Sequence, residues 1–572
     1  MHLHFLGGAS TVTGSRFHLT TVRASVLIDC GMFQGAPNES IRNRIPLGFD
    51  PEKLNAILLT HAHLDHCGLL PIAVRMGFNG PIHATAATAE LAELVLLDSG
   101  RLHEEFAKRG GRWEARHPEA AIAEDRTAAL DFIAAVDRAH DADHQAAAEE
   151  ASPGAKGASG GSGLDAAYDT PRGPLRFVTG SVKTGEHVVT LIEPADDVDA
   201  AIEDPEADLR GAGPDLLIDL DAPLYTEKEA SAVLAHFRAV RYGAEIEVAP
   251  GIQATFLDAG HILGSAIIRL RVREVEDGPE RIIVFSGDLG RPGAPILKDP
   301  AVLSRADYVC VESTYGGREH EPQAEAVRIL AEAIREVERS DGVLLVPSFA
   351  IGRTQEIVWQ LDRLVDAGEI PLIPLYLDSP MAAKASNVYR RHTEVYDDET
   401  AAIFRSGDTP LDYPKQTITN QLEQSLAIAH APRPYMIVAS NGMLTGGRVV
   451  SHLRRLIDDP LATILFVGFQ GRGTLGSHLQ AGARTVKLDG AVRQVRCRIR
   501  SINGFSAHAD EPALLAWLGR FGQGLRAGDP GYPRRVFLVH GDPDAQGALA
   551  PKVEALGFDV HVPGWHERVA LD

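Results

Sequence analysis

The chain has 572 residues, 44% of them hydrophobic and 23% charged, and its formal charge at pH 7 is −22. This length predicts two to four domains of about 150 residues, and the composition is that of a globular protein with a sizeable core. No apolar run reaches the roughly 20 residues that cross a bilayer, and we identify no signal peptide. Four cysteines without CxxC spacing indicate a reducing compartment, so we expect a cytoplasmic protein without membrane contact. The acidity by itself argues against nucleic-acid binding, which normally needs a basic surface.

The first part of the chain, up to residue 112, predicts short strands separated by glycine-rich turns. Apolar runs with alternating polar residues are typical of strands, and a stretch rich in alanine and leucine that follows them is typical of a helix. The predicted strands cover 2–7, 16–21, 25–31 and 55–61, and the predicted helix covers 85–97.

The composition changes between residues 113 and 222. This segment holds 24 Asp and Glu against 8 Lys and Arg, a net charge of −16, and includes the linker-like run GAKGASGGSG. Low hydrophobicity with high charge favours disorder, so we expect a mostly mobile insertion. Two runs inside it, at 174–181 and 186–194, have the pattern of a small hairpin.

Regular structure is predicted again from about residue 223. Between about 318 and 500 strands and helices alternate, which predicts a parallel sheet with helices on its faces. The predicted strands are 253–257, 266–273, 282–286, 342–348, 371–377, 435–440, 463–469 and 535–541, and the predicted helices are 322–338 and 354–366.

The segment ILLTHAHLDHCG (57–68) contains four potential metal ligands within six consecutive residues. His61 and His63 are two residues apart on an extended segment, so their imidazoles point to the same side. Asp65 and His66 follow directly and face a second position. Imidazole and carboxylate ligands together suit zinc, and this set can serve two metal ions a few ångströms apart. An accidental polar loop is the alternative, and four ligands in six residues argue against it.

Further ligands are expected at the ends of other apolar strands. His261 follows the strand at 253–257, Asp288 follows the strand at 282–286, and His540 lies at the end of the last predicted strand. A glycine beside each of these residues lets the backbone turn sharply, so that the side chains can reach a shared site. Each residue alone is more typical of a hydrogen-bonded turn, but together with the first cluster they indicate a metal centre.

The HxHxDH cluster resembles the signature of the metallo-β-lactamase superfamily, and VLIDCG (26–31) is similar to the first motif of that superfamily. The resemblance implies an αββα sandwich with a dinuclear zinc site. Asp29, in the first motif, would orient the ligands without binding metal. The implied ligands are His61, His63 and His261 for one ion, Asp65 and His66 for the other, and Asp288 as a bridge between the two.

Three later segments resemble motifs A, B and C of the β-CASP group, which are metallo-β-lactamase nucleases with an inserted α/β domain. They contain Glu312 in YVCVESTYGG, His508 in INGFSAHAD, and His540. VASNGMLTGGR (438–448) and PSFAIGRTQE (347–356) resemble the inserted domain itself. The resemblance implies a metallo-β-lactamase domain made of 1–112, 223–317 and 501–572 and a β-CASP domain at 318–500. The acidic insertion at 113–222 lies outside the resemblance.

The resemblance is strongest for the subgroup that acts on RNA. It includes the catalytic subunit of the eukaryotic pre-mRNA 3′-end cleavage complex and its bacterial and archaeal relatives. Motif C holds His540 here, whereas the DNA-processing branch typically has an apolar residue at that position. We therefore expect a zinc-dependent ribonuclease whose partner is RNA, acting as an endonuclease, a 5′-to-3′ exonuclease or both. Dimers are common in groups that this chain resembles, so a homodimer is possible.

The expected chemistry follows from the substrate. A phosphodiester is an anion with a poor leaving group, so its hydrolysis needs charge neutralisation and a strong nucleophile. Hydroxide generated on two zinc ions would attack phosphorus and leave 5′-phosphate and 3′-hydroxyl ends. His508 would donate a proton to the leaving group, Glu312 would keep His508 protonated, and Asp65 would complete the catalytic residues. The alternative for His508 and Glu312 is an ordinary turn histidine paired with a carboxylate.

Two other functions stay open at this point. One is a small-molecule metallohydrolase acting on an ester, thioester or lactam, which would need no inserted α/β domain to hold a polymer. The other is a non-cleaving RNA-processing scaffold, against which the complete ligand set counts. Three residues are weaker candidates for contacts with substrate phosphates: Ser506 next to motif B, and Arg353 and Arg448 after glycine-rich turns.

Two charged segments bear on RNA access. VRQVRCRIRS (492–501) predicts one strand with Arg496, Arg498 and Arg500 on a shared face, which is either solvated or a track for RNA phosphates. The insertion carries −16 of the total charge of −22, which leaves −6 for the rest of the chain. Because the acidity belongs mainly to the insertion, the overall charge does not exclude nucleic acid. We hypothesise that the insertion screens an RNA-binding cleft or acts as a mobile polyanion.

Overall fold

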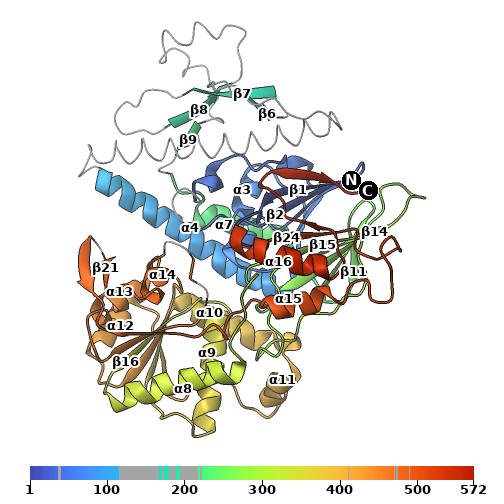
Figure 1. Cartoon of the computed structure of the whole chain (residues 1–572). Coiled ribbons are helices and arrows are strands. Elements are labelled where there is room, and N and C mark those ends of the chain that lie inside the picture. The colour runs from blue at the N-terminus through green and yellow to red at the C-terminus, as the bar shows by residue number, and fades with distance from the viewer. Residues whose placement is uncertain are drawn as a thin grey trace.

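Figure 1 shows the computed structural model of the chain. The structure describes residues 1–35, 40–114, 222–409, 411–468, 470–471, 474–488 and 490–572, and four short strands between 167 and 219; of 110–114 and of those strands only the backbone is described. The three largest sheets are two that pack face to face and a separate one flanked by helices, and the N- and C-termini lie next to each other (Figure 1). Within these ranges, every helix is too short or too polar to cross a membrane.

Two seven-stranded sheets pack face to face. The first has the order β10-β5-β4-β3-β2-β1-β26 and the second the order β11-β12-β13-β14-β15-β24-β25. The first contains β1 (His2–Gly7), β2 (Arg16–Thr20), β3 (Ser25–Ile28), β4 (Ala56–Leu58), β5 (Ile82–Thr85), β10 (Phe237–Val240) and β26 (Glu567–Ala570). The second contains β11 (Glu245–Ala249), β12 (Ile252–Asp258), β13 (Ala266–Val272), β14 (Arg281–Phe285), β15 (Tyr308–Glu312), β24 (Arg535–Val539) and β25 (Val560–His561).

Apolar side chains from both sheets fill the space between them. Phe5 and Ile28 of the first sheet belong to one buried cluster with Phe256, Phe285 and Phe537 of the second, because alternate residues of each strand point inward. Helices cover the two outer faces, α3, α4 and α7 on the first sheet and α15 and α16 on the second (Figure 1). This arrangement confirms the predicted αββα sandwich. The helices are α2 (Leu64–Cys67), α3 (Leu70–Arg75), α4 (Ala86–Glu114), α7 (Glu227–Val233), α15 (Glu511–Leu518) and α16 (Pro543–Ala555).

A third sheet has six parallel strands in the order β18-β17-β19-β16-β20-β23. Helices α8 and α9 pack on one face and α13 and α14 on the other, which confirms the predicted parallel sheet between two helical layers. The strands are β16 (Val343–Pro347), β17 (Leu375–Asp378), β18 (Gln416–Ile418), β19 (Tyr435–Ala439), β20 (Ala462–Phe466) and β23 (Arg498–Ser501). The helices are α8 (Gln323–Arg339), α9 (Arg353–Asp366), α10 (Pro380–Arg391), α11 (Asp398–Arg405), α12 (Leu422–Ala427), α13 (Arg448–Leu456) and α14 (Leu475–Gln480).

Helix α4 is longer than the sequence predicted. The prediction ended at residue 97, whereas the helix continues to Glu114. Glycine normally weakens a helix, but Gly100 allows another segment to pack closely against α4. A Cβ at this position would lie 2.8 Å from backbone atoms of Thr226 and Glu227. The extended helix contacts both α7 and α10, and thereby joins the sandwich to the third sheet.

The prediction of one strand over 492–501 is wrong. Its first part is β22 (Ala491–Gln494), which pairs with β21 (Thr485–Leu488) in a hairpin, and its last part is β23 of the six-stranded sheet. The chain leaves the hairpin between them, at Arg496. Arg498 and Arg500 both contact Glu336 of α8, at 3.4 and 2.6 Å, so their charges are partly neutralised within the protein.

Most of the predicted insertion at 113–222 lies outside the described residues. The prediction that it is mobile concerns those residues and stays a prediction. The backbone of β6 (Ala167–Thr170), β7 (Gly173–Val178), β8 (Val188–Ile192) and β9 (Leu217–Asp219) is described. Strands β7 and β8 pair antiparallel, which confirms the predicted hairpin.

Candidate metal centre

The structure brings all seven predicted ligands together at one end of the sandwich. They come from the loops that follow β4, β12, β14 and β24 and, for Asp65 and His66, from the short helix α2, so both sheets contribute. The ligand atoms fall into overlapping groups whose members lie within 4.8 Å of one another. The groups are His61, His63, His261 and Asp288, then Asp65, His66 and His540, and then Asp288, Glu312 and His508.

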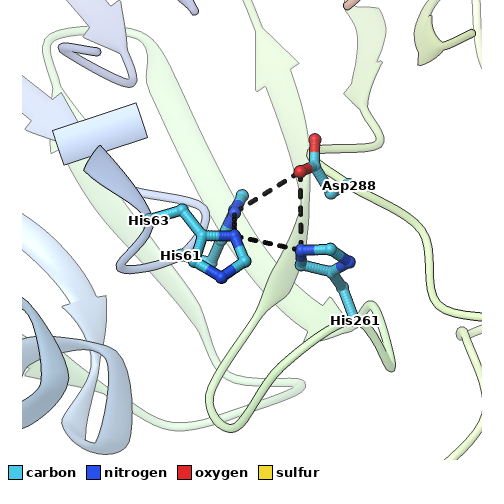
Figure 2. Close-up of side chains that lie close together, drawn as sticks. All are labelled: His61, His63, His261 and Asp288. Carbon is cyan, nitrogen blue, oxygen red and sulfur yellow. Dashed lines mark hydrogen bonds and ion pairs between the residues drawn. The ribbon is translucent and has the colours of Figure 1, made fainter. Parts of the chain in front are cut away.

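Figure 2 shows the first group, in which three imidazoles and one carboxylate converge. His63 Nδ1 lies 3.1 Å from His61 Nε2 and 3.2 Å from His261 Nε2. Asp288 Oδ2 lies 3.5 Å from the Nε2 atoms of both His61 and His261. Two nitrogens bound to one tetrahedral zinc ion are separated by about 3.3 Å, so these four atoms have the spacing of a zinc ligand set.

The second group faces the other oxygen of the same carboxylate. Asp288 Oδ1 lies 3.3 Å from His66 Nε2 and 3.5 Å from His540 Nδ1. Asp65 Oδ2 lies 3.5 Å from His540 Nε2. Asp288 therefore stands between the two groups, with one oxygen toward each.

Several buried atoms of these ligands have no hydrogen-bond partner among the described residues. They include His66 Nε2, Asp288 Oδ1 and His540 Nε2. A buried polar atom without a partner is costly unless a ligand satisfies it. Together with the donor set of imidazoles and carboxylates, this shows that the residues fit a bound metal such as zinc.

The protonation of the first group also suits metal binding. Burial holds the pKa of His61 and His261 well below the usual value and lowers the pKa of His63 to about 4. These three imidazoles are therefore neutral at pH 7, which is the form that binds a metal. His66 differs: although its burial acts in the opposite direction, the carboxylates of Asp288 and Asp29 raise its pKa well above the usual value.

Asp29 lies directly behind His66. Its Oδ2 accepts a hydrogen bond from His66 Nδ1 at 2.8 Å, and its Oδ1 accepts one from Thr60 N at 2.7 Å. Asp29 is 1% exposed and His66 is 1% exposed. This contact fixes the proton on Nδ1 and directs Nε2 toward Asp288. That Asp29 orients a metal ligand without binding metal itself stays a prediction.

Sharp turns of the backbone carry the strand-end ligands into the centre. Gly260, before His261, and Gly287, before Asp288, have φ of +68° and +54°, which glycine adopts readily. At the third of these ligands, His540, the neighbouring glycine that the sequence predicted to make the turn does not have the positive φ. His540 itself has φ of +48°, and Gly541 is instead needed for space, because its Cβ would lie 2.3 Å from Ser313 Oγ.

His508 and Glu312 meet at the edge of the metal centre. His508 Nδ1 lies 3.0 Å from Glu312 Oε2 and 3.9 Å from Asp288 Oδ2. Glu312 is fully buried, whereas the side chain of His508 is 19% exposed. The carboxylates of Glu312 and Asp288 outweigh the effect of burial and raise the pKa of His508 to about 9. The pair can thus present a protonated imidazole next to a metal-bound substrate.

The three weaker candidates for phosphate contacts are all engaged within the protein. Ser506 is 3% exposed and accepts a hydrogen bond from His508 N at 3.3 Å. Arg353 is 5% exposed and donates to Glu356 at 2.7 Å. Arg448 donates to Asp378 at 2.8 Å. Of the three, Ser506 lies beside His508, and contact with a substrate stays a prediction for each.

Two residues at the site were missed at the level of sequence. Thr60 donates from its hydroxyl to Asp29 at 2.8 Å, and its position directly before the HxH pair was an available signal. His320 contacts the carbonyl oxygen of His508 through Nε2 at 3.0 Å. Since His320 is far from His508 in the sequence, its part in supporting that loop could not be predicted.

Three family models match the chain. They are described as metallo-beta-lactamase superfamily (residues 19–144), Beta-Casp domain (354–479) and Zn-dependent metallo-hydrolase RNA specificity domain (493–563). The chain is 30% identical to ribonuclease TTHA0252 of Thermus thermophilus over 99% of both proteins. It is 26% identical to the transcription termination factor FttA of Methanosarcina mazei, over 96% of this chain and 68% of that protein. The FttA of Thermococcus kodakarensis is 33% identical over 56% of this chain and 49% of that protein.

Proposed function

Because the chain belongs to the β-CASP RNA nucleases of the metallo-β-lactamase superfamily, we propose that it hydrolyses RNA phosphodiester bonds at a centre of two zinc ions. The observation that carries the proposal is the position of Asp288 between two ligand groups, with His508 3.9 Å away. A centre for two metals beside a protonated imidazole suits cleavage of a phosphodiester, which needs charge neutralisation and a proton for its leaving group.

We assign the ligands to the two ions by their contacts. His61, His63 and His261 would hold one ion, and Asp65, His66 and His540 the other, with Asp288 facing both. When bound, zinc supplies Lewis acidity that neutralises phosphate charge and makes water a strong nucleophile at neutral pH.

The residues around the metal ligands perform the proton transfer. His508 would donate its proton to the ribose 3′-oxygen as the bond from phosphorus to that oxygen breaks. Glu312 holds the imidazole in place through Nδ1 and keeps it protonated. With water as the nucleophile the products carry 5′-phosphate and 3′-hydroxyl ends. Attack by the ribose 2′-hydroxyl would instead give a 2′,3′-cyclic phosphate.

Product mapping tests the proposal. A 5′-labelled RNA is incubated with the zinc-loaded protein and, in parallel, with protein treated with a chelator. We expect cleavage only with zinc, and fragments that end in a 3′-hydroxyl, with 5′-phosphate on the downstream product. A cyclic phosphate as the primary product would refute the mechanism. RNA binding without cleavage would identify a scaffold, and turnover of a lactam or thioester but not of RNA would identify a small-molecule hydrolase.

A further inference from the structure

A buried ionic network joins the metal-centre loop to the six-stranded sheet. Arg291, three residues after Asp288, donates from Nη2 to Glu356 Oε1, and Arg353 Nη1 donates to Glu356 Oε2 at 2.7 Å. Arg291 is 9% exposed, Glu356 8% and Arg353 5%. Glu356 and Arg353 lie in the first turn of α9. The network therefore connects the sandwich, which carries the ligands, to the domain packed beside it.

The charges and hydrogen bonds of this network do not favour the stability of the fold. Two guanidinium groups share one carboxylate, so the network carries one more positive than negative charge. Nε and Nη1 of Arg291 are buried without a hydrogen-bond partner in the part of the chain that the structure describes. Buried ion pairs contribute little net stability, and unpaired buried N–H groups reduce it. A network of this kind is better explained by the geometry that it imposes.

That geometry concerns the segment next to His508. Gly290 forms an isolated antiparallel bridge with His508, and Leu289 O accepts a hydrogen bond from Ala509 N at 2.7 Å. Leu289 N donates to Glu312 Oε1 at 2.6 Å. The short segment 289–291 thus contacts both the imidazole-bearing loop and the carboxylate that orients it, and Arg291 anchors the end of this segment on α9.

We propose that Arg291 and Glu356 are positioning residues for His508: their ion pair fixes the segment 289–291, and through it the imidazole, relative to the metal ligands. This inference rests on the proposed function for the role of His508 as proton donor. Neither residue touches the ligand atoms in the described contacts, so the effect passes through the backbone of Leu289 and Gly290.

The proposal predicts a dependence on the leaving group. The ribose oxygen released from RNA needs the proton of His508, whereas p-nitrophenolate leaves without one. A shift of about 1 Å in a catalytic group can cost roughly 100-fold in rate. Loss of the Arg291 contact should therefore slow the cleavage of RNA much more than the hydrolysis of bis(p-nitrophenyl) phosphate.

The test compares Arg291→Met and Arg291→Lys with the control Arg391→Met. Arg391 also joins the two domains, through Glu90 of α4 at 3.1 Å, but it is exposed. For Arg291→Met we expect kcat on RNA to fall roughly 10- to 100-fold with KM within about twofold, and turnover of the p-nitrophenyl ester within about threefold. Arg291→Lys, which keeps the charge, should lie between Arg291→Met and wild type and carries the test if Arg291→Met does not fold. Arg391→Met should match wild type.

A double-mutant cycle completes the experiment. In a His508→Ala background, Arg291→Met should cause less than about a twofold further loss on RNA, because both changes remove the same function. Three results would each overturn the positioning role. They are an additive loss of kcat in the double variant, an equal loss of kcat in Arg391→Met, and a rise in KM with unchanged kcat in Arg291→Met. If the wild type does not cleave RNA at all, the proposed function fails, and the inference that rests on it fails with it. If it does and the cycle is additive, only the inference about Arg291 fails.

Discussion

His508 Nδ1 lies 3.1 and 3.0 Å from the two carboxylate oxygens of Glu312, a residue that is fully buried at the end of β15. Because a carboxylate can only accept, the proton of the imidazole must be on Nδ1 in this contact. The second nitrogen, Nε2, is then left to act on a substrate when His508 is doubly protonated. Leu289 N also donates to Glu312 at 2.6 Å, which fixes the carboxylate against the metal loop.

This contact predicts the ranking of two substitutions. His508→Ala should reduce kcat on RNA by roughly 10²- to 10⁴-fold, the usual contribution of general acid–base catalysis. Glu312→Gln should reduce it less, because the amide can still orient the ring but no longer favours its charged form. Zinc content and the melting temperature of the His508→Ala protein should match those of the wild type. Unchanged turnover in His508→Ala would remove His508 from the mechanism.

Metal stoichiometry provides a second prediction. Asp65 belongs to only one of the two ligand groups, so Asp65→Ala should lower the zinc content from two ions per chain to about one and abolish cleavage of RNA. Asp366→Ala is a matched control, since Asp366 is an exposed carboxylate at the end of α9, outside both ligand groups, and pairs with Arg363 at 3.1 Å. Elemental analysis after gel filtration measures the number of zinc ions per chain. A wild-type protein with one ion, or an Asp65→Ala protein with two, would contradict the assignment.

The clustering of the candidate metal ligands was predictable because the pattern that identifies them is local. Four of them fall within six residues at the end of β4, and His261, Asp288 and His540 each follow an apolar run. Strand endings could be read from the sequence, since alternation and turn residues determine them over a few positions.

Contacts between distant segments could not be predicted in the same way. Gly100 lies inside α4 because the backbone of α7 approaches it, and no local signal reports that approach. The division of 492–501 depends on which strand each half pairs with. The link from Arg291 to Glu356 spans 65 residues, and arginine and glutamate are ordinary surface residues until the fold buries them.

Asp29 supplies a third prediction, about metal affinity rather than turnover. Asp29→Asn keeps an oxygen for Thr60 N, but an amide nitrogen cannot accept the hydrogen bond from His66 Nδ1. Loss of such a contact behind a ligand typically weakens metal binding 10- to 100-fold. Competition with a chromophoric chelator measures the zinc affinity. Asp307→Asn serves as control, since Asp307 is a buried carboxylate that accepts from Ile282 N outside the metal centre. Equal affinities for wild type and Asp29→Asn would contradict the orienting role.

The last prediction concerns stability at acid pH and depends on His18 of β2. Its Nε2 lies 2.7 Å from Ser25 Oγ. Burial, with smaller effects from His4 and Arg568, lowers the pKa of His18 to about 3. In the unfolded chain a histidine titrates near 6.5, so between these two values the unfolded state binds the proton that the folded state excludes. The contribution of neutral His18 is therefore complete above about pH 6.5 and is lost as the pH falls toward 3.

At pH 5 this difference corresponds to about 2 kcal/mol of unfolding free energy, because the folded protein holds His18 neutral while the unfolded chain is almost fully protonated. His18→Gln removes the titration and keeps a side chain that can hydrogen bond to Ser25, so this variant should lose about 2 kcal/mol less than the wild type between pH 7.5 and 5.0. Urea denaturation of both proteins at the two pH values measures the difference. All other titrating groups are shared, so a parallel loss in both proteins would show that His18 is protonated in the folded state and that the burial of its ring does not control acid stability.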